Sequence, residues 1–154
     1  METAVHGRFP GLPLPTLDGP PRDLSRAGQR TLVVLGHGEC ATTRLLLPFV
    51  ERIHAHRAPG TAVVVVLQDT AADARALAAE LRLSMPVLLD EEPWTLGAAL
   101  ATEVVPLTMV VEPGGRIAES WPAFRRDDLE RAAVLFGAAP LFTPDEQVPA
   151  LRPG

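Results

Sequence analysis

Lysine is absent from this 154-residue chain, so all 14 of its basic residues are arginines, and the net charge is −5. The arginines do not gather into a dense basic cluster. Nucleic acids and anionic membrane surfaces attract proteins through a high density of positive charge. We therefore expect neither a nucleic acid nor a membrane among the partners of this protein.

Cysteine is nearly absent, because Cys40 is the single cysteine of the chain. One cysteine cannot form a disulfide within the chain, nor can it supply a cysteine-rich zinc site. His54 and His56 fall on a predicted helix, where histidines are more often solvated than bound to a metal. We expect no metal and no bound cofactor.

Long apolar runs are missing as well. None approaches the ~20 residues that a membrane-spanning helix needs, and residues 1–8 lack the basic region and apolar stretch of a signal peptide. Hydrophobic residues nevertheless make up 47% of the chain and charged residues 21%, which excludes a disordered chain. We expect a soluble, cytoplasmic protein.

Apolar runs of strand length alternate with segments of helical periodicity. Because alternating strands and helices indicate a parallel sheet, and a hairpin adds an antiparallel edge, the order predicts an α/β domain. The predicted strands are 31–35, 61–67 and 86–89, with a hairpin at 107–121, and the predicted helices are 41–57, 74–81, 91–101 and 129–136.

The chain divides into three parts by composition. Residues 1–30 are rich in proline and glycine and are expected to pack on the domain as an entry segment. Residues 31–137 form the domain itself. Residues 138–154 contain four prolines and no periodicity, so we expect a loose tail there.

Cys40 is the position with the clearest chemical content. It follows a buried strand and precedes an amphipathic helix, so the helix N-terminus should stabilise its thiolate. Thr43 lies one turn later on the same face, where its hydroxyl could hydrogen-bond the sulfur. A protonated His37 would also favour the thiolate, whereas Glu39 would oppose it. These effects together predict a modest lowering of the Cys40 pKa. The alternative is a small, inert core residue, since free cysteines are often buried.

Several segments, in their order and spacing, resemble thioredoxin-like proteins of the redoxin type, the group of TlpA-like thiol oxidoreductases and AhpC/TSA peroxiredoxins. The resemblance covers about residues 8–136. It is carried by the following segments: Gly11–Gly19 followed by Arg22–Ser25 at the entry, Thr31–Leu35 as the first core strand, Cys40–Thr43 in place of the Cys-x-x-Cys motif, Pro48 in the helix, Val105–Thr108 in place of the cis-proline segment, and Glu112–Ile117 at the hairpin turn.

This resemblance implies a thioredoxin-like fold with a central mixed sheet flanked by helices. It also implies a cis bond between Val105 and Pro106, with Pro106 against the nucleophilic sulfur. The backbone of Val105 would then pair with the substrate.

The departures from the family pattern leave three functions open. Thr43 replaces the second cysteine, so the chain cannot run a dithiol cycle. His37 stands where peroxiredoxins carry a threonine, and Glu39 stands where an aromatic residue is common. The first possibility is a monothiol oxidoreductase that acts on protein disulfides or mixed disulfides through Cys40 and is regenerated by an external thiol. The second is a one-Cys peroxidase. The third is a non-catalytic binding module that retains a vestigial cysteine. The oligomeric state is not predicted.

Overall fold

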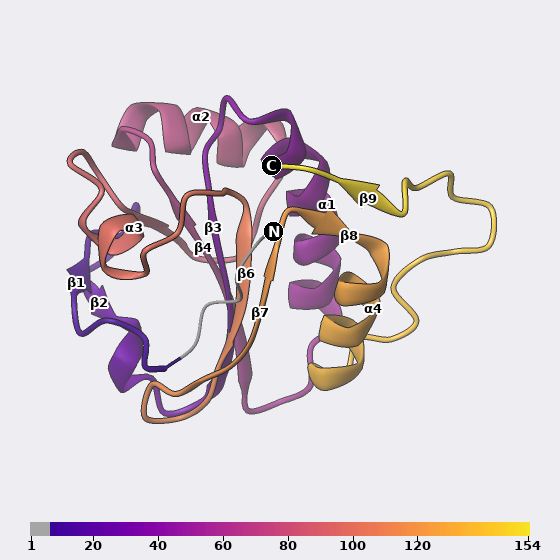
Figure 1. Ribbon diagram of the computed structural model, residues 1–154, viewed down its shortest axis with the longest axis horizontal. Helices are drawn as coiled ribbons and strands as arrows, with labels where there is room; N and C mark the ends of the chain where they lie inside the picture. Colours follow the sequence, from indigo (N-terminus) through magenta and orange to yellow (C-terminus); the bar gives the residue numbers. More distant parts are fainter. Residues whose placement is uncertain (1–6) are drawn as a thin grey trace.

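The central sheet has five strands in the order β5–β4–β3–β6–β7 (Figure 1). In the computed structural model, which describes residues 7–154, β3, β4 and β5 are parallel, and β6 and β7 form an antiparallel hairpin beside β3. The mixed sheet expected from the resemblance is confirmed. The bounds are Arg30–Gly36 for β3, Thr61–Leu67 for β4, Val87–Leu89 for β5, Leu107–Val111 for β6 and Ile117–Pro122 for β7.

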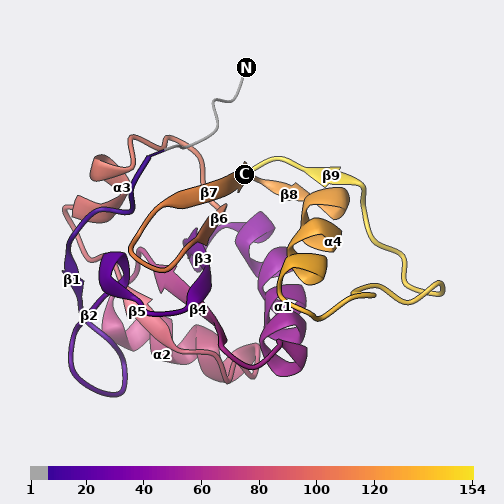
Figure 2. The ribbon, with the colours of Figure 1, turned by 90° about the horizontal axis from the view of Figure 1, so that it is seen from below.

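Both faces of the sheet are buried, because successive strand residues alternate between two apolar cores. Leu32 and Val34 of β3 belong to one core, and Val33 and Leu35 to the other. Helices α1 (Ala41–His56), α2 (Ala71–Glu80) and α4 (Arg126–Leu135) contribute to the first core. The short helix α3 (Thr95–Ala99) and the entry segment cover the second (Figure 2).

The helix ends follow from their sequences. The hydroxyl of Thr70 accepts a hydrogen bond from the Asp73 amide and caps α2. Gly137 takes a positive φ of 71° directly after the end of α4, a conformation that glycine adopts at little cost. No helix among residues 7–154 has both the length and the apolar character needed to span a membrane.

The entry segment packs along the edge of the sheet, as far as it is described; residues 1–6 lie outside the described residues. It contains β1 (Pro13–Leu14), β2 (Arg22–Asp23) and the 3-10 helix η1 (Leu24–Arg26). The amide of Leu89 donates to the Pro15 carbonyl, and the Leu17 amide donates to the Val87 carbonyl. The segment thereby supplies hydrogen-bond partners to the edge strand β5.

Residues 138–154, expected to be loose, are packed against the domain. Leu141 is buried in the first core, and the Phe142 ring lies 4.9 Å from the Phe49 ring, centroid to centroid. Glu146 pairs with Arg52 at 2.6 Å. The chain then returns as β9 (Leu151–Arg152), antiparallel to β8 (Phe124–Arg125), as Figure 1 shows in yellow. The anchoring contacts are irregularly spaced, which is why no periodicity revealed them.

Asp90 begins the acidic run Asp90–Glu92, a composition typical of a solvated helix start, yet the residue is only 3% exposed. Its carboxylate accepts hydrogen bonds from the amides of Leu96 and Gly97 in α3 and from the side chain of Gln68. Asp90 therefore satisfies amides at the start of α3 from inside the protein, whereas Glu91 and Glu92 are exposed.

Candidate active site

Cys40 is the N-cap residue of α1, as the sequence predicts. The loop after β3 closes when the Cys40 amide donates to the His37 carbonyl, and α1 begins when the Arg44 amide donates to the Cys40 carbonyl. The Cys40 side chain is partly exposed rather than sealed in a core. The thiol therefore combines access to solvent with the positive end of a sixteen-residue helix.

The surroundings of the sulfur favour its ionised form. Burial raises the pKa of the Cys40 thiol, but the backbone amides and hydroxyls of Thr43 and Thr42 outweigh burial, so the pKa lies below its ordinary value. In the neutral thiol no cap hydrogen bond to the sulfur is fully formed. These donors nevertheless face the place where the negative charge of a thiolate would develop.

Thr43 is held rigidly at the base of the site. It is fully buried, and its hydroxyl oxygen accepts a hydrogen bond from the His37 amide at 3.3 Å. Gly36, the last residue of β3, makes room for it: a Cβ at position 36 would lie 2.7 Å from Thr43 Cγ2. The end of β3 and the first turn of α1 thus fix the hydroxyl beside Cys40.

The segment before β6 completes the site on the other side of the sulfur. The Val105–Pro106 bond is cis, as the resemblance implies. The Cys40 Sγ lies 3.8 Å from the carbonyl oxygen of Val105, although the two residues are 65 positions apart. The structure therefore brings Cys40, Thr43 and Val105 together in one place.

His37 and Glu39 are arranged differently from the other predicted residues. The His37 Nδ1 lies 3.2 Å from an Asp69 carboxylate oxygen and 3.1 Å from the Glu39 amide nitrogen. The second Asp69 oxygen accepts a hydrogen bond from the Gly38 amide. The His37 ring thus contacts Asp69 and the Glu39 backbone, whereas the groups that lower the pKa of Cys40 against the effect of burial are Thr43 and Thr42.

The sequence reasoning missed Asp69, Thr42 and the residues around Gly154. Asp69 follows β4 and lies next to the loop after β3, because parallel strands end at the same edge of a sheet. The parallel pairing of β3 with β4 was therefore the feature from which the position of Asp69 could have been predicted. The Thr42 hydroxyl donates to the Pro153 carbonyl oxygen, and Gly154 lies against the Val105 carbonyl.

Within residues 7–154, no group of three or more histidine, cysteine or acidic side chains could hold a metal ion.

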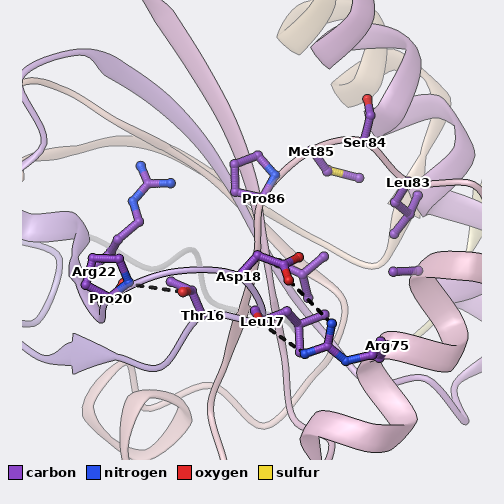
Figure 3. A pocket seen from close by; sticks show the side chains of 12 residues that line it. Thr16, Leu17, Asp18, Pro20, Arg22, Arg75, Leu83, Ser84, Met85 and Pro86 are labelled. Carbon is purple, nitrogen blue, oxygen red and sulfur yellow. Dashed lines mark hydrogen bonds and ion pairs between the residues drawn. The ribbon is translucent and has the colours of Figure 1, made fainter.

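A hollow of about 450 Å³ lies away from Cys40, between the entry loop, α2 and the start of β5 (Figure 3). None of the predicted site residues lines it. Its Arg75 is engaged by Asp18 and by the Leu17 carbonyl. We place the candidate active site at Cys40 because this residue carries a partly exposed thiol with a lowered pKa.

No model of a known protein family matches the sequence, and no curated protein matches it. Solved structures do match. A Chlorobium tepidum protein assigned as the thiol:disulfide interchange protein DsbE has a TM-score of 0.74 at 21% identity, over 86% of this chain and 96% of that one. The thioredoxin domain of a Bacteroides vulgatus thiol-disulfide oxidoreductase has a TM-score of 0.72 at 18% identity, over 87% and 98%.

The chain has a thioredoxin-like fold. The same fold links it to the Xanthomonas campestris bacterioferritin comigratory protein, described for alkyl peroxide reduction, with a TM-score of 0.71 at 14% identity over 88% and 98% of the two chains. Thioredoxin-like structures therefore serve both disulfide and peroxide chemistry. At these identities the likeness establishes the fold, and the reaction has to be argued from this chain's own residues.

Proposed function

We propose that this protein is a monothiol thiol–disulfide oxidoreductase with Cys40 as its nucleophile. The observation that carries the proposal is the position of the Cys40 sulfur. It lies partly exposed at the start of α1, its pKa is lowered by Thr43 and Thr42, and it is 3.8 Å from the Val105 carbonyl. An inert structural cysteine needs none of these features.

The reaction takes two exchange steps. The Cys40 thiolate attacks one sulfur of a substrate disulfide; that S–S bond breaks, a mixed disulfide forms on Cys40, and the departing thiolate takes a proton from water. An external thiol, either a low-molecular-weight thiol or a dithiol protein, then attacks the mixed disulfide and releases the Cys40 thiolate. The external thiol leaves in a disulfide with the group that it takes from Cys40, so one substrate sulfur is reduced while the sulfur of the external thiol is oxidised. Thr43 cannot perform the second step, so the reductant must come from outside.

The neighbouring residues have separate roles in this scheme. Thr43 and Thr42 stabilise Cys40 as the attacking thiolate and again as the leaving thiolate. Val105 and Pro106 border the position of the sulfur that Cys40 attacks, so the Val105 backbone positions the substrate. His37 and Glu39 modulate the site indirectly, through the loop that Asp69 holds.

A turnover assay with a glutathionylated peptide and excess glutathione tests the proposal. Wild-type protein should release the peptide catalytically, and Cys40→Ser should fall to the uncatalysed background. Consumption of stoichiometric hydrogen peroxide by Cys40, without disulfide exchange, would replace the proposal with a one-Cys peroxidase. A thiol that reacts with neither compound would identify a binding module.

A further inference from the structure

The last residues of the chain lie against two neighbours of the reactive sulfur. Figures 1 and 2 both show the yellow C-terminal segment leaving α4, passing along the outside of the domain and ending near the start of α1. Pro153 and Gly154 there contact Thr42 and Val105, the same two residues that border Cys40.

The segment is bound as an added β-strand. Leu151 and Arg152 pair antiparallel with Arg125 and Phe124. The Arg126 amide donates to the Ala150 carbonyl at 3.0 Å. An extended chain that hydrogen-bonds to a free strand edge is a common way for a protein to bind a peptide through its main chain.

Main-chain recognition continues up to the sulfur. The Thr42 hydroxyl donates to the Pro153 carbonyl oxygen. Because it has one hydrogen, it donates either to that oxygen or to the Cys40 thiolate, whose pKa it lowers. Gly154 packs so closely on Val105 that a side chain at this position would collide with the Val105 carbonyl oxygen and would lie 2.8 Å from Val104 Cγ1. The segment thus fills the space between β8, Thr42 and Val105.

We propose that the groove formed by β8, Thr42 and Val105 is a binding site for an extended peptide backbone, and that residues 151–154 occupy it in cis as an internal competitor. That the bound peptide carries a disulfide rests on the proposed function. That residues 151–154 occupy the groove does not depend on it. The substrate class is then a peptide or protein disulfide rather than a small-molecule disulfide. The C-terminal segment must leave the groove before the substrate enters.

The short connection between residues 141–146 and residues 151–154 makes the C-terminal segment a strong competitor for the groove. Leu141 and the Arg52–Glu146 ion pair hold residues 141–146 against the domain, so only a short connection separates the anchor from the groove. A segment on a short tether has an effective concentration on the order of millimolar. A peptide in trans at micromolar concentration should bind measurably only when the segment has been removed.

The test measures the rate of Cys40 alkylation by iodoacetamide, at a pH where the thiol of every variant is fully ionised. The Cys40 side chain is only partly exposed with the segment in place, so deletion of residues 151–154 should raise the rate. The increase reaches about tenfold if the sulfur reacts only in the open groove and the segment covers the groove for about nine-tenths of the time. The heptapeptide Val-Pro-Ala-Leu-Arg-Pro-Gly, which is the sequence of residues 148–154, should restore the slow rate in trans, and a scrambled heptapeptide should not.

A second pair of variants keeps the chain at full length. Gly154→Ala should displace the segment from Val105 and raise the alkylation rate, whereas Gly28→Ala, whose added Cβ would meet nothing within 4 Å, should leave it unchanged. Equal alkylation rates for wild type, the deletion and Gly154→Ala would overturn the proposal, as would a heptapeptide that protects no better than its scrambled form. Because alkylation needs no enzymatic turnover, a failure of the oxidoreductase assay would leave this result standing.

Discussion

The Cys40 sulfur and the Val105 carbonyl oxygen lie 3.8 Å apart at the junction of two sequence-distant segments. Cys40 belongs to the turn that begins α1, and Val105 to the turn that begins β6. Since β3 and β6 are paired along Thr31–Leu35, the sheet itself fixes the distance between these turns. A change that shifts either turn should alter the reactivity of the thiol.

Replacement of Thr43 by valine should raise the pKa of Cys40. The substitution keeps the shape of the side chain but removes the hydroxyl that faces the sulfur and accepts from the His37 amide. Thiolate ultraviolet absorbance across a pH series measures the shift. The lost partner of the amide should also lower the free energy of unfolding by about 1–3 kcal/mol.

Thr31→Val is the matched control for this prediction. Thr31 is also fully buried, and its hydroxyl donates to the Gln29 carbonyl at the opposite end of β3. It should cost stability without moving the Cys40 titration. Equal titration curves for Thr43→Val and wild type would show that the hydroxyl does not stabilise the thiolate.

The stability of the protein should depend on pH through Cys40. Burial raises its pKa, but the Thr43 and Thr42 donors lower it by more, so the net folded-state pKa is below the unfolded value, which is about 8.5. Between these two values the unfolded state binds more protons, so the free energy of unfolding rises with pH. This contribution is fully present above the unfolded pKa and is lost as the pH falls through the folded pKa.

Denaturant unfolding of wild type and Cys40→Ser across this pH window measures the effect. The difference between their unfolding free energies should increase with pH, because the serine does not ionise. A difference that stays constant across the window would contradict a lowered thiol pKa.

Gly36→Ala should disturb the site from the far side of Thr43. The added Cβ would lie 2.7 Å from Thr43 Cγ2, and overpacking of this kind costs about 1–3 kcal/mol. Thr43 must move, so the Cys40 pKa should rise together with the loss of stability. Chemical denaturation and thiolate titration measure the two effects, and Gly28→Ala provides the unhindered control. A stable variant with an unchanged thiol would show that Thr43 is not held by this contact.

Thr43→Cys should rebuild a Cys-x-x-Cys pair. Thr43 faces the Cys40 sulfur from the first turn of α1, at the (i, i+3) spacing at which side chains on a helix meet. Mild oxidation should form an internal disulfide, seen by mass spectrometry as the loss of both free thiols, and the variant should reduce a model disulfide faster than wild type. Ala41→Cys, exposed and adjacent in sequence, should keep two free thiols.

The parts of this structure that could be predicted depend on local sequence. β3 contains the uninterrupted apolar run 32–35 and β4 the run 62–67. The helix after Cys40 has a clear apolar period, so the start of α1 followed directly. Val105 could be placed beside Cys40 only through the family resemblance, because no local pattern reports a contact across 65 positions.

The parts that could not be predicted depend on distant contacts between polar or irregularly spaced residues. Asp90 belongs to an acidic run that is typical of a solvated surface, yet Gln68 and the α3 amides bury it. The His37–Asp69 pair requires the register of β3 against β4. The C-terminal segment is held by the Phe142–Phe49 contact and the Glu146–Arg52 ion pair. The residues that make these contacts follow no helical or strand periodicity in the sequence.

The most direct test of the central claim is the pH dependence of the reaction between Cys40 and a model disulfide, followed by release of the chromophoric thiol. The rate of the folded protein relative to that of the same chain unfolded in urea should increase as the pH falls below about 8.5, because the folded thiol stays ionised to lower pH. A ratio of the two rates that stays constant over this range would contradict an activated nucleophile at Cys40.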